Sequence, residues 1–540
     1  MTLWMEYYCK HYCKHSLKQN VDTLMKILRF LDMYHFVFIV CLSVLNLVDA
    51  CVDYTECTLP DGKVGMCYKK MCHGKVNDAQ RENLTFTIVV KYPESVLQSH
   101  GRTTLYIRGN GLCLNWNKGK RLSKISNDTW GINITYKSVV TKYQCQTRSK
   151  PVFLPGNKLQ YRALADDCDD MVGANFSINL PISKTSLYFV EKPVFISYPW
   201  FYQKTGVISS FLINSTYIGK ERNVTMYTPP SFNENTYKTY PVVFVLDLNL
   251  HFAKYFKKNL EGPIYPHAVS EEYAIIGFGD YRNDGKERFD LLAPIVSPFL
   301  FCINGTFEDN CDGCVPENAT FPNDFFPYLL DFCGRKVKIG GLADNMLDFL
   351  VKEALPFANK LALTRLQTEN VGIMGYSLGG LMSCYAVWTR PNVFSFAACQ
   401  SSSFWWPINN SSYFEVDFHF INKTLKNPLF HNNRPEQKIY LDAGGGELPI
   451  AAPWYMLQAT LETASIITDF EHYTLDKNVW VHVHPFKNHT YIEWGKRMGQ
   501  ALATLLPAGG TQRIPSRIAA HASGREKMLS GLEIGQMLTI

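Results

Sequence analysis

Six short, almost wholly apolar segments between residues 241 and 484 constrain the fold of the chain more than any other feature. They read "PVVFVLD", "YAIIGF", "VGIMGYS", "FSFAACQ", "KIYLDA" and "VWVHVH". Such runs are expected for parallel strands whose sheet is covered by helices on both faces. Between the second and third, Leu342, Met346, Leu350 and Ala354 fall on one face of a predicted helix. Residues 200–507 therefore predict an α/β domain with a doubly wound, mostly parallel sheet.

Residues 81–190 carry a different pattern. The segments "LTFTIVV", "TTLYIRG" and "GINITYKSVV" alternate apolar and polar residues and are separated by Gly, Asn and Asp. Short strands at this spacing predict a small all-β sandwich domain. Trp116 and Trp130 are either its core aromatics, the more common case, or a stacking platform that binds glycans. Residues 51–80 form a cysteine-rich segment too short for a core of its own, and residues 508–540 read as a disordered tail.

Residues 1–50 read as an N-terminal extension followed by a signal peptide. Lys26 and Arg29 precede an apolar run, residues 36–48, that is too short for a comfortable membrane span. The residues before Met25 are either an over-extended start or the cytosolic side of a signal anchor. We expect a secreted protein without a stable membrane span after cleavage, with a signal-anchored luminal or extracellular domain as the alternative.

Two further features favour an oxidising compartment. The sequence holds twelve N-x-S/T sequons, which together indicate a glycoprotein. Its 16 cysteines include the clusters 51–72 and 302–333, which we interpret as disulfides and not as halves of a zinc site. Cys384 and Cys399 lie in apolar runs and are predicted to be buried thiols. The net charge of +6 without a Lys/Arg block gives no reason to expect nucleic acid as a partner.

The segment "GYSLGG", residues 375–380, contains a candidate nucleophile, Ser377. A G-x-S-x-G pattern arises by chance in many long chains, so its context decides. Here a predicted strand precedes the serine and a predicted helix follows it, as the nucleophile elbow of serine hydrolases requires. The glycines permit a strained, crowded turn, and the N–H of Leu378 is directed at a developing oxyanion.

A serine needs a general base, and the base needs an acid to orient it. In the order Ser, acid, His, the base should follow the last strand, where His489 lies just before a final helix. His482 and His484 lie within that strand. The acid should follow the preceding strand, where Glu447 and Asp442 are the candidates. We favour Glu447, because a glycine run can swing it towards His489, and keep Asp442 as the alternative.

These landmarks make residues 200–507 similar to the putative esterase family of α/β-hydrolases, which includes esterase D and the enterobactin esterases. The matching segments are "YPVVFVLDLNLHF", "RFDLLAP", "GIMGYSLGG", "IYLDAGGGE" and "HTYIEWGKRMGQAL". The resemblance implies a serine hydrolase of carboxylic esters or thioesters that needs neither a metal nor an organic cofactor. It implies a second oxyanion N–H near Leu248, where the family often has glycine, and a small-molecule or carbohydrate-linked ester as substrate.

Other features leave alternatives open. The insert 295–338 has four cysteines and is a candidate lid or specificity rim, and a sequon at Asn488 adjoins His489. Trp405 and Trp406 either shape the substrate pocket or pack in the core. Two competing functions use the same fold: a catalytically idle extracellular binding protein, and an acyltransferase with a site that disfavours water.

Overall fold

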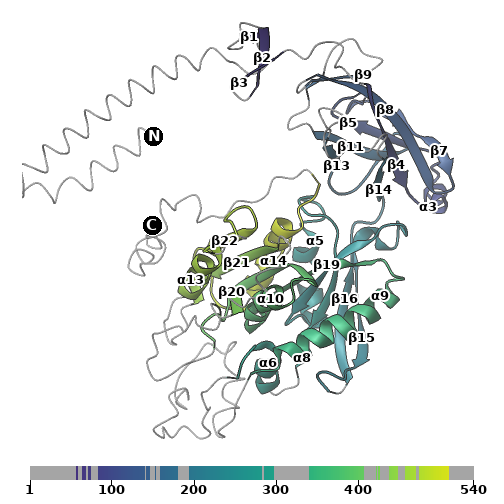
Figure 1. Cartoon of the computed structure of the whole chain (residues 1–540). Coiled ribbons are helices and arrows are strands. Elements are labelled where there is room, and N and C mark those ends of the chain that lie inside the picture. The colour runs from purple at the N-terminus through teal and green to yellow at the C-terminus, as the bar shows by residue number, and fades with distance from the viewer. Residues whose placement is uncertain are drawn as a thin grey trace, which may run out of the picture. The chain divides into compact units, whose positions relative to one another are not determined.

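The structure, a computed structural model shown in Figure 1, describes most of the chain between residues 83 and 509. The described ranges are 56–58, 64–68, 71–74, 83–112, 114–139, 142–145, 152–153, 158–179, 194–219, 221–281, 285–296, 340–406, 421, 424–425, 437–447, 456–469 and 473–509. The predicted signal peptide, nearly all of the insert 295–338 and of the tail, and five sequons lie outside them. Contacts divide the chain into Met1–Glu82 and Asn83–Ile540. In the first unit, three strands pair antiparallel: β1 (Glu56–Thr58), β2 (Val64–Tyr68) and β3 (Met71–Gly74).

Two sheets share one apolar core in the first part of the second unit. One sheet has the order β10-β9-β8-β4-β14 with β7 beside β8, and the other has the order β12-β11-β5-β6 with β13 beside β11. The bounds are β4 Asn83–Lys91, β5 Leu105–Gly109, β6 Lys120–Arg121, β7 Ser123–Ser126, β8 Thr129–Val139, β9 Lys142–Cys145, β10 Val152–Phe153, β11 Lys158–Ala165, β12 Asp169–Asp170, β13 Phe176–Asn179 and β14 Val194–Ser197, with helix α3 at Glu94–Ser99. Both sheets contribute to the core through alternate residues, for example Ile88 and Ile107.

An eight-stranded sheet organises the rest of the unit, in the order β15-β16-β18-β17-β19-β20-β21-β22. Strands β15 and β16 are antiparallel to their neighbours, and the six predicted apolar strands run parallel. The bounds are β15 Val207–Asn214, β16 Glu221–Thr228, β17 Tyr240–Leu246, β18 Ala274–Phe278, β19 Leu366–Ser377, β20 Phe394–Ser402, β21 Lys438–Gly444 and β22 Val479–His484. The strand order changes direction between β17 and β19, so their carboxyl ends lie side by side where α/β sheets bind ligands.

Helices cover both faces of this sheet, as the apolar runs predict (Figure 1). Along β17, Phe244 and Leu246 face one core, whereas Val243 and Val245 face the other. The first core holds residues of α6 (Gly285–Leu292), α8 (Ala343–Asp348), α9 (Leu355–Leu361), α10 (Leu378–Thr389) and α13 (Met456–Thr468). The second holds residues of α4 (Leu250–Tyr255), α5 (Lys257–Glu261) and α14 (Tyr491–Leu505). The chain therefore contains the predicted α/β domain.

The helix predicted around residues 342–354 differs from the expectation at its start. Met346, Leu350 and Ala354 are buried, but Leu342 is 42% exposed and lies before the first helical residue. Between α8 and α9, the segment Phe349–Ala354 forms a π-helical turn, which the simple four-residue periodicity did not anticipate. In the part of the chain that is described, every helix is too short or too polar to cross a membrane.

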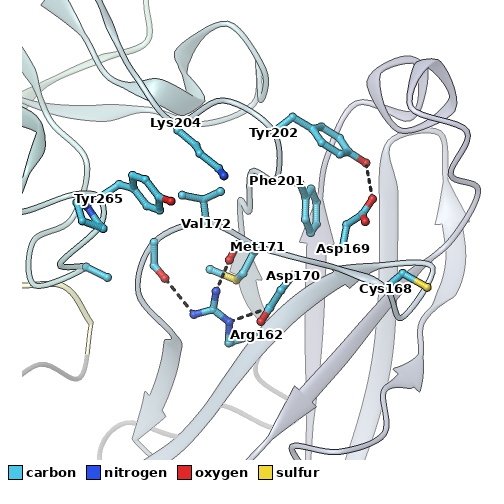
Figure 2. A pocket seen from close by; sticks show the side chains of 13 residues that line it. Arg162, Cys168, Asp169, Asp170, Met171, Val172, Phe201, Tyr202, Lys204 and Tyr265 are labelled. Carbon is cyan, nitrogen blue, oxygen red and sulfur yellow. Dashed lines mark hydrogen bonds and ion pairs between the residues drawn. The ribbon is translucent and has the colours of Figure 1, made fainter.

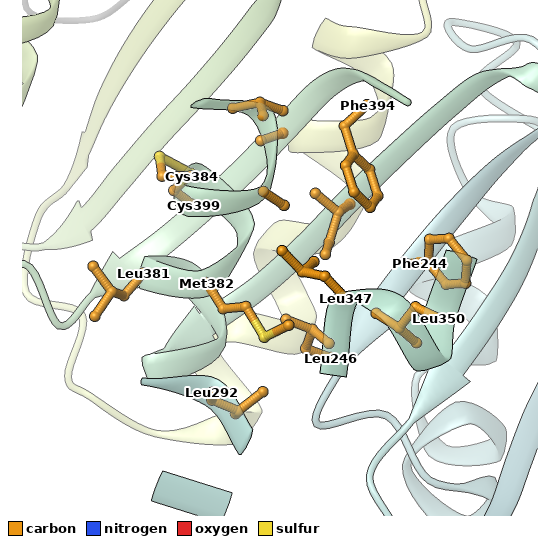
Figure 3. Packing of buried hydrophobic residues seen from close by; sticks show 14 of the residues in the cluster. Phe244, Leu246, Leu292, Leu347, Leu350, Leu381, Met382, Cys384, Phe394 and Cys399 are labelled. Atoms are coloured by element: carbon orange, nitrogen blue, oxygen red, sulfur yellow. A yellow bond between two sulfur atoms is a disulfide. The ribbon is translucent and has the colours of Figure 1, made fainter. Parts of the chain in front are cut away.

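Cys384 and Cys399 are joined by a disulfide, so the prediction of buried thiols is wrong (Figure 3). Cys384 lies on α10 and Cys399 on β20, and the packing of this helix against this strand brings their Cα atoms to 5.9 Å. Both residues are fully buried in the larger core of the α/β domain. The disulfide therefore fastens the helix that follows the candidate nucleophile to the neighbouring strand.

Removing this disulfide is expected to lower the free energy of unfolding by about 3 kcal/mol, because it closes a loop of 15 residues in the unfolded chain. The measurement is urea denaturation of the Cys384→Ala/Cys399→Ala protein. Cys168→Ala is the matched control, since Cys168 is exposed and unpaired, and should change stability by less than about 0.5 kcal/mol. A double variant as stable as the parent would contradict the prediction.

Candidate active site

Ser377 lies at the carboxyl end of β19 and directly precedes α10. Its backbone has φ 57° and ψ −124°, in the left-handed region that a residue with a side chain seldom adopts. Such strain persists only where the surrounding structure enforces it, and it clusters at functional sites. The Ser403 N–H donates to the Ser377 carbonyl at 3.0 Å, and the two hydroxyl oxygens lie 3.3 Å apart. Ser377 is therefore held in a strained turn between a strand and a helix, the geometry that a nucleophile elbow requires.

The two glycines that flank the elbow are required by space. A Cβ atom on Gly375 would lie 2.6 Å from the backbone of Gly379, closer than real Cβ contacts. A Cβ atom on Gly379 would lie 2.9 Å from Oδ2 of Asp247 at the end of β17. The missing side chains thus allow the turn to close on itself and the neighbouring loop to approach it.

Glu447 and His489 are brought together by the loops that follow β21 and β22. His489 Nδ1 lies 3.4 Å from Glu447 Oε2, a distance that suits a catalytic pair in a protein without substrate. The two loops pack closely: the N–H of Gly446 donates to the Lys487 carbonyl at 3.0 Å, where a Cβ on Gly446 would meet Asn488. The glycine run therefore lets the acid-bearing loop fit against the histidine-bearing loop.

Trp494 connects the histidine to the elbow. Its ring packs edge to face against His489, with 4.5 Å between centroids, and stacks on Tyr376 at 4.0 Å. Tyr376 immediately precedes Ser377, and Trp494 lies in the first turn of α14. The candidate residues Ser377, Glu447 and His489 therefore lie at the carboxyl ends of the parallel strands β19, β21 and β22 or in the loops that follow them.

Asp442, the alternative acid, has a different set of partners. It is fully buried, accepts from Gln400 at 3.0 Å, and lies 3.6 Å from His484 and 3.5 Å from Arg497. Burial by itself would raise the pKa of Asp442, but the charge of Arg497, the nearby His484 and the hydrogen bond from Gln400 hold that pKa below its ordinary value. These contacts therefore keep Asp442 ionised. No group of three or more His, Cys, Asp or Glu side chains in the described ranges is placed to hold a metal ion.

The Asp442 carboxylate is expected to make stability depend on pH. Because its pKa is lowered in the folded protein, its contribution is present above the unfolded pKa of about 3.9 and is lost as the pH falls through the folded value. The difference in unfolding free energy between the parent and Asp442→Asn should therefore be largest at neutral pH and shrink below about pH 4. Chemical denaturation at several pH values measures it, and a constant difference would contradict the expectation.

The N–H groups of the two predicted oxyanion donors, Leu378 and Leu248, differ in whether they are free to bind an oxyanion. Leu378 is the first residue of α10, and the N–H groups of a first helical turn have no partner within the helix. The Leu248 N–H, in contrast, donates to the Phe278 carbonyl at 3.0 Å, because the pairing of β17 and β18 continues beyond the strand ends. Leu248 is therefore not available as the second donor, and that part of the prediction is corrected.

Most of the tryptophans considered as ligand-binding residues pack in the cores of the protein. Trp405 and Trp406 are buried in the larger core, and their indole N–H groups donate to Met456 Sδ and to the Ile295 carbonyl. Trp130 is only 1% exposed in the two-sheet core, so it cannot form a sugar-stacking platform with Trp116. The packing interpretation is favoured for all except Trp116, which is 40% exposed.

A cavity of about 680 Å³ lies away from these residues (Figure 2). Its lining includes three aromatic side chains, Phe201, Tyr202 and Tyr265. Arg162 donates a hydrogen bond to Asp170 there, and the side chain of Lys204 points into the cavity. None of the predicted catalytic residues and neither Trp116 nor Trp130 lines it. It is therefore separate from the candidate catalytic residues.

Three residues at the site were not predicted. Ser401 and Ser403 belong to the segment "SSSFWW", in which only the tryptophans were considered. Arg497 lies on α14 among the buried residues Trp494 and Met498. An arginine within an apolar helical stripe is a signal that could have been used, since a buried charge requires a partner.

Comparison with known proteins finds a family that resembles part of this domain. Residues 331–505 match the family described as "Putative esterase". A siderophore enterobactin esterase from Emericella nidulans is 32% identical over 77 residues, which cover 14% of this chain and about a quarter of that relative. The siderophore hydrolase EstA from Aspergillus nidulans has 17% identity and a TM-score of 0.39, covering 55% of this chain and 91% of its own. The enterobactin esterase FES from Shigella flexneri, solved in the presence of enterobactin, has 12% identity and a TM-score of 0.35, covering 79% and 96%. Residues 331–505 of the α/β domain are therefore similar to the family described as "Putative esterase".

Proposed function

We propose that this protein is a serine hydrolase that cleaves carboxylic esters of small molecules. The observation that carries the proposal is Ser377 in a strained elbow at φ 57°, next to strand ends that bring Glu447 within 3.4 Å of His489. The match of residues 331–505 to the family described as "Putative esterase" supports the same chemistry. A binding protein would have no need to retain the strained serine and the paired acid and histidine together.

In the proposed reaction, His489 accepts the hydroxyl proton of Ser377 while Oγ attacks the ester carbonyl carbon. The N–H of Leu378 stabilises the oxyanion of the tetrahedral intermediate. Collapse of the intermediate forms the acyl-enzyme, and His489 transfers its proton to the leaving alkoxide. Water, activated by the same histidine, then releases the acid and restores Ser377. Glu447 orients His489 and stabilises its charged form.

A fluorophosphonate probe tests the proposal against the idle binding protein. Wild-type protein should be labelled at a single serine, and Ser377→Ala should not be labelled, because only an activated hydroxyl reacts at a useful rate. Absence of labelling in folded protein would favour the binding function.

A second experiment distinguishes hydrolysis from acyl transfer. It analyses the products formed from a p-nitrophenyl ester in the presence of an added alcohol. A hydrolase should give the free acid as the main product, whereas an acyltransferase should give the new ester.

We further propose that the chain enters the secretory pathway. The signal pattern at residues 25–49 supports this, as do the disulfide of the α/β domain and the exposure of sequon asparagines. The exposed ones in the described ranges are Asn127, Asn133, Asn214, Asn223 and Asn488, and Asn175 is half-buried. Protein from a eukaryotic culture medium should lose mass when treated with peptide N-glycosidase F. Unchanged mass, or retention inside the cell, would contradict the proposal.

A further inference from the structure

The end of β20 makes polar contacts with both the candidate nucleophile and the candidate acid. Ser403 lies against Ser377, as described above, and two residues earlier Ser401 Oγ donates to Glu447 Oε1 at 2.7 Å. Ser401 is fully buried. Because Glu447 uses its other oxygen, Oε2, towards His489, the Ser401 bond fixes the carboxylate from the opposite side.

Ser401 occupies an irregular position in the sheet. Tyr376 pairs with Gln400 and Ser377 pairs with Ser402, so Ser401 is an extra residue of β20 without a partner in the β19–β20 register. Its φ is 41°, in the region that residues with side chains avoid. A bulge of this kind re-aims a side chain and is common next to active sites. Here its effect is to direct the hydroxyl to the acid.

Arg497 completes the arrangement from α14. Its side chain is 5% exposed, and Nη2 donates to Ser401 Oγ at 2.8 Å. The same nitrogen lies 3.7 Å from Glu447 Oε1 and 3.5 Å from Asp442 Oδ1. The two carboxylate oxygens therefore lie within about 7 Å of each other in a buried region, where like charges repel strongly unless a cation lies between them.

We propose that Ser401 and Arg497 are positioning residues for the triad acid: Arg497 orients the Ser401 hydroxyl, and Ser401 holds Glu447 towards His489. This inference rests on the proposed esterase function. Arg497 has a second role: its positive charge compensates the negative charges of both Glu447 and Asp442. It thereby separates two acid–histidine pairs, Glu447 with His489 and Asp442 with His484.

The test compares Ser401→Ala with Ser402→Ala. Ser402 is the matched control, since it is equally buried on the same strand and its hydroxyl has no hydrogen-bond partner among the described residues. With p-nitrophenyl acetate, Ser401→Ala should lower kcat about 10- to 100-fold with KM nearly unchanged, as expected for a misplaced catalytic group. Ser402→Ala should stay within about twofold of wild type. Ser401→Gly removes the same hydroxyl, tolerates the positive φ, and should behave like Ser401→Ala if alanine hinders folding.

Two substitutions of Arg497 separate the effect of its charge from the effect of its shape on kcat. Arg497→Met should lower kcat at least as much as Ser401→Ala, and Arg497→Lys should recover part of the loss because it keeps the charge. Arg222→Met is the control for removing a buried arginine, since Arg222 is 2% exposed and pairs with Glu287 in another part of the domain. It should lower stability without changing kcat of the folded protein.

The outcomes separate this inference from the proposed function. An active wild type in which Ser401→Ala and Ser402→Ala have equal kcat would overturn the positioning role and leave the esterase function standing. Equal losses of kcat in Arg497→Met and Arg222→Met would mean that Arg497 only stabilises the fold and does not position the acid. A wild type with no more activity than Ser377→Ala would overturn both the function and the inference.

Discussion

Replacing Ser377 with alanine is expected to lower kcat for p-nitrophenyl ester hydrolysis by about 10⁵-fold or more. The alanine removes the only atom of the proposed mechanism that forms a covalent bond to the acyl group. What remains is binding and the oxyanion N–H of Leu378, which in serine hydrolases retain a small part of the acceleration. The backbone of the elbow should persist, because the close packing that Gly375 and Gly379 permit does not involve the hydroxyl.

Ser383→Ala is the matched control for this prediction. Ser383 is a buried serine one turn further along α10, and its hydroxyl donates to the Gly379 carbonyl at 2.7 Å. Its loss should cost about 1 kcal/mol of stability and leave kcat within a few-fold of the parent. Initial rates and the release of p-nitrophenol in a single turnover measure both variants. Substantial turnover by folded Ser377→Ala protein would mean that another group attacks the ester.

The α/β class was predictable because parallel strands buried on both faces leave a direct trace in the sequence. Val242 to Leu246 are all apolar, and the structure divides them between two cores on opposite faces of the sheet. The π-helical turn at Phe349–Ala354 left no such trace, since periodicity alone assumes a regular helix. Leu342 was misplaced for a related reason: an apolar residue beside a helix fits the pattern whether or not it is helical.

Only the part of the site that follows from the order of residues along the chain could be predicted. Ser377, Glu447 and His489 follow the strands in the order expected for the fold, and the structure places the latter two side by side. Leu248 could not be judged, because its backbone N–H is engaged by an extension of the sheet that no side chain reveals. The Cys384–Cys399 pair and the Ser401–Arg497 contact depend on how α10 and α14 pack against β20. Such contacts between distant segments are invisible to local patterns.

The identity of the acid gives the second large effect. Glu447→Gln is expected to lower kcat by about 10³- to 10⁴-fold, because a neutral amide neither stabilises the charged histidine nor enforces the required tautomer. Asp442→Asn should lower kcat by less than about tenfold, since its carboxylate lies by Gln400, His484 and Arg497 and not by His489. Its main effect should be on stability, because removing one partner leaves Arg497 a buried cation with less compensation.

The comparison is made with p-nitrophenyl acetate at a temperature where both variants are folded by circular dichroism. If Asp442→Asn shows the larger loss of kcat, Asp442 is the triad acid and the Glu447–His489 contact is incidental. The double variant is informative as well. Because Arg497 contacts both carboxylates, the effects of the single changes on stability should not add. Their effects on kcat should remain dominated by Glu447, since only that carboxylate acts on His489.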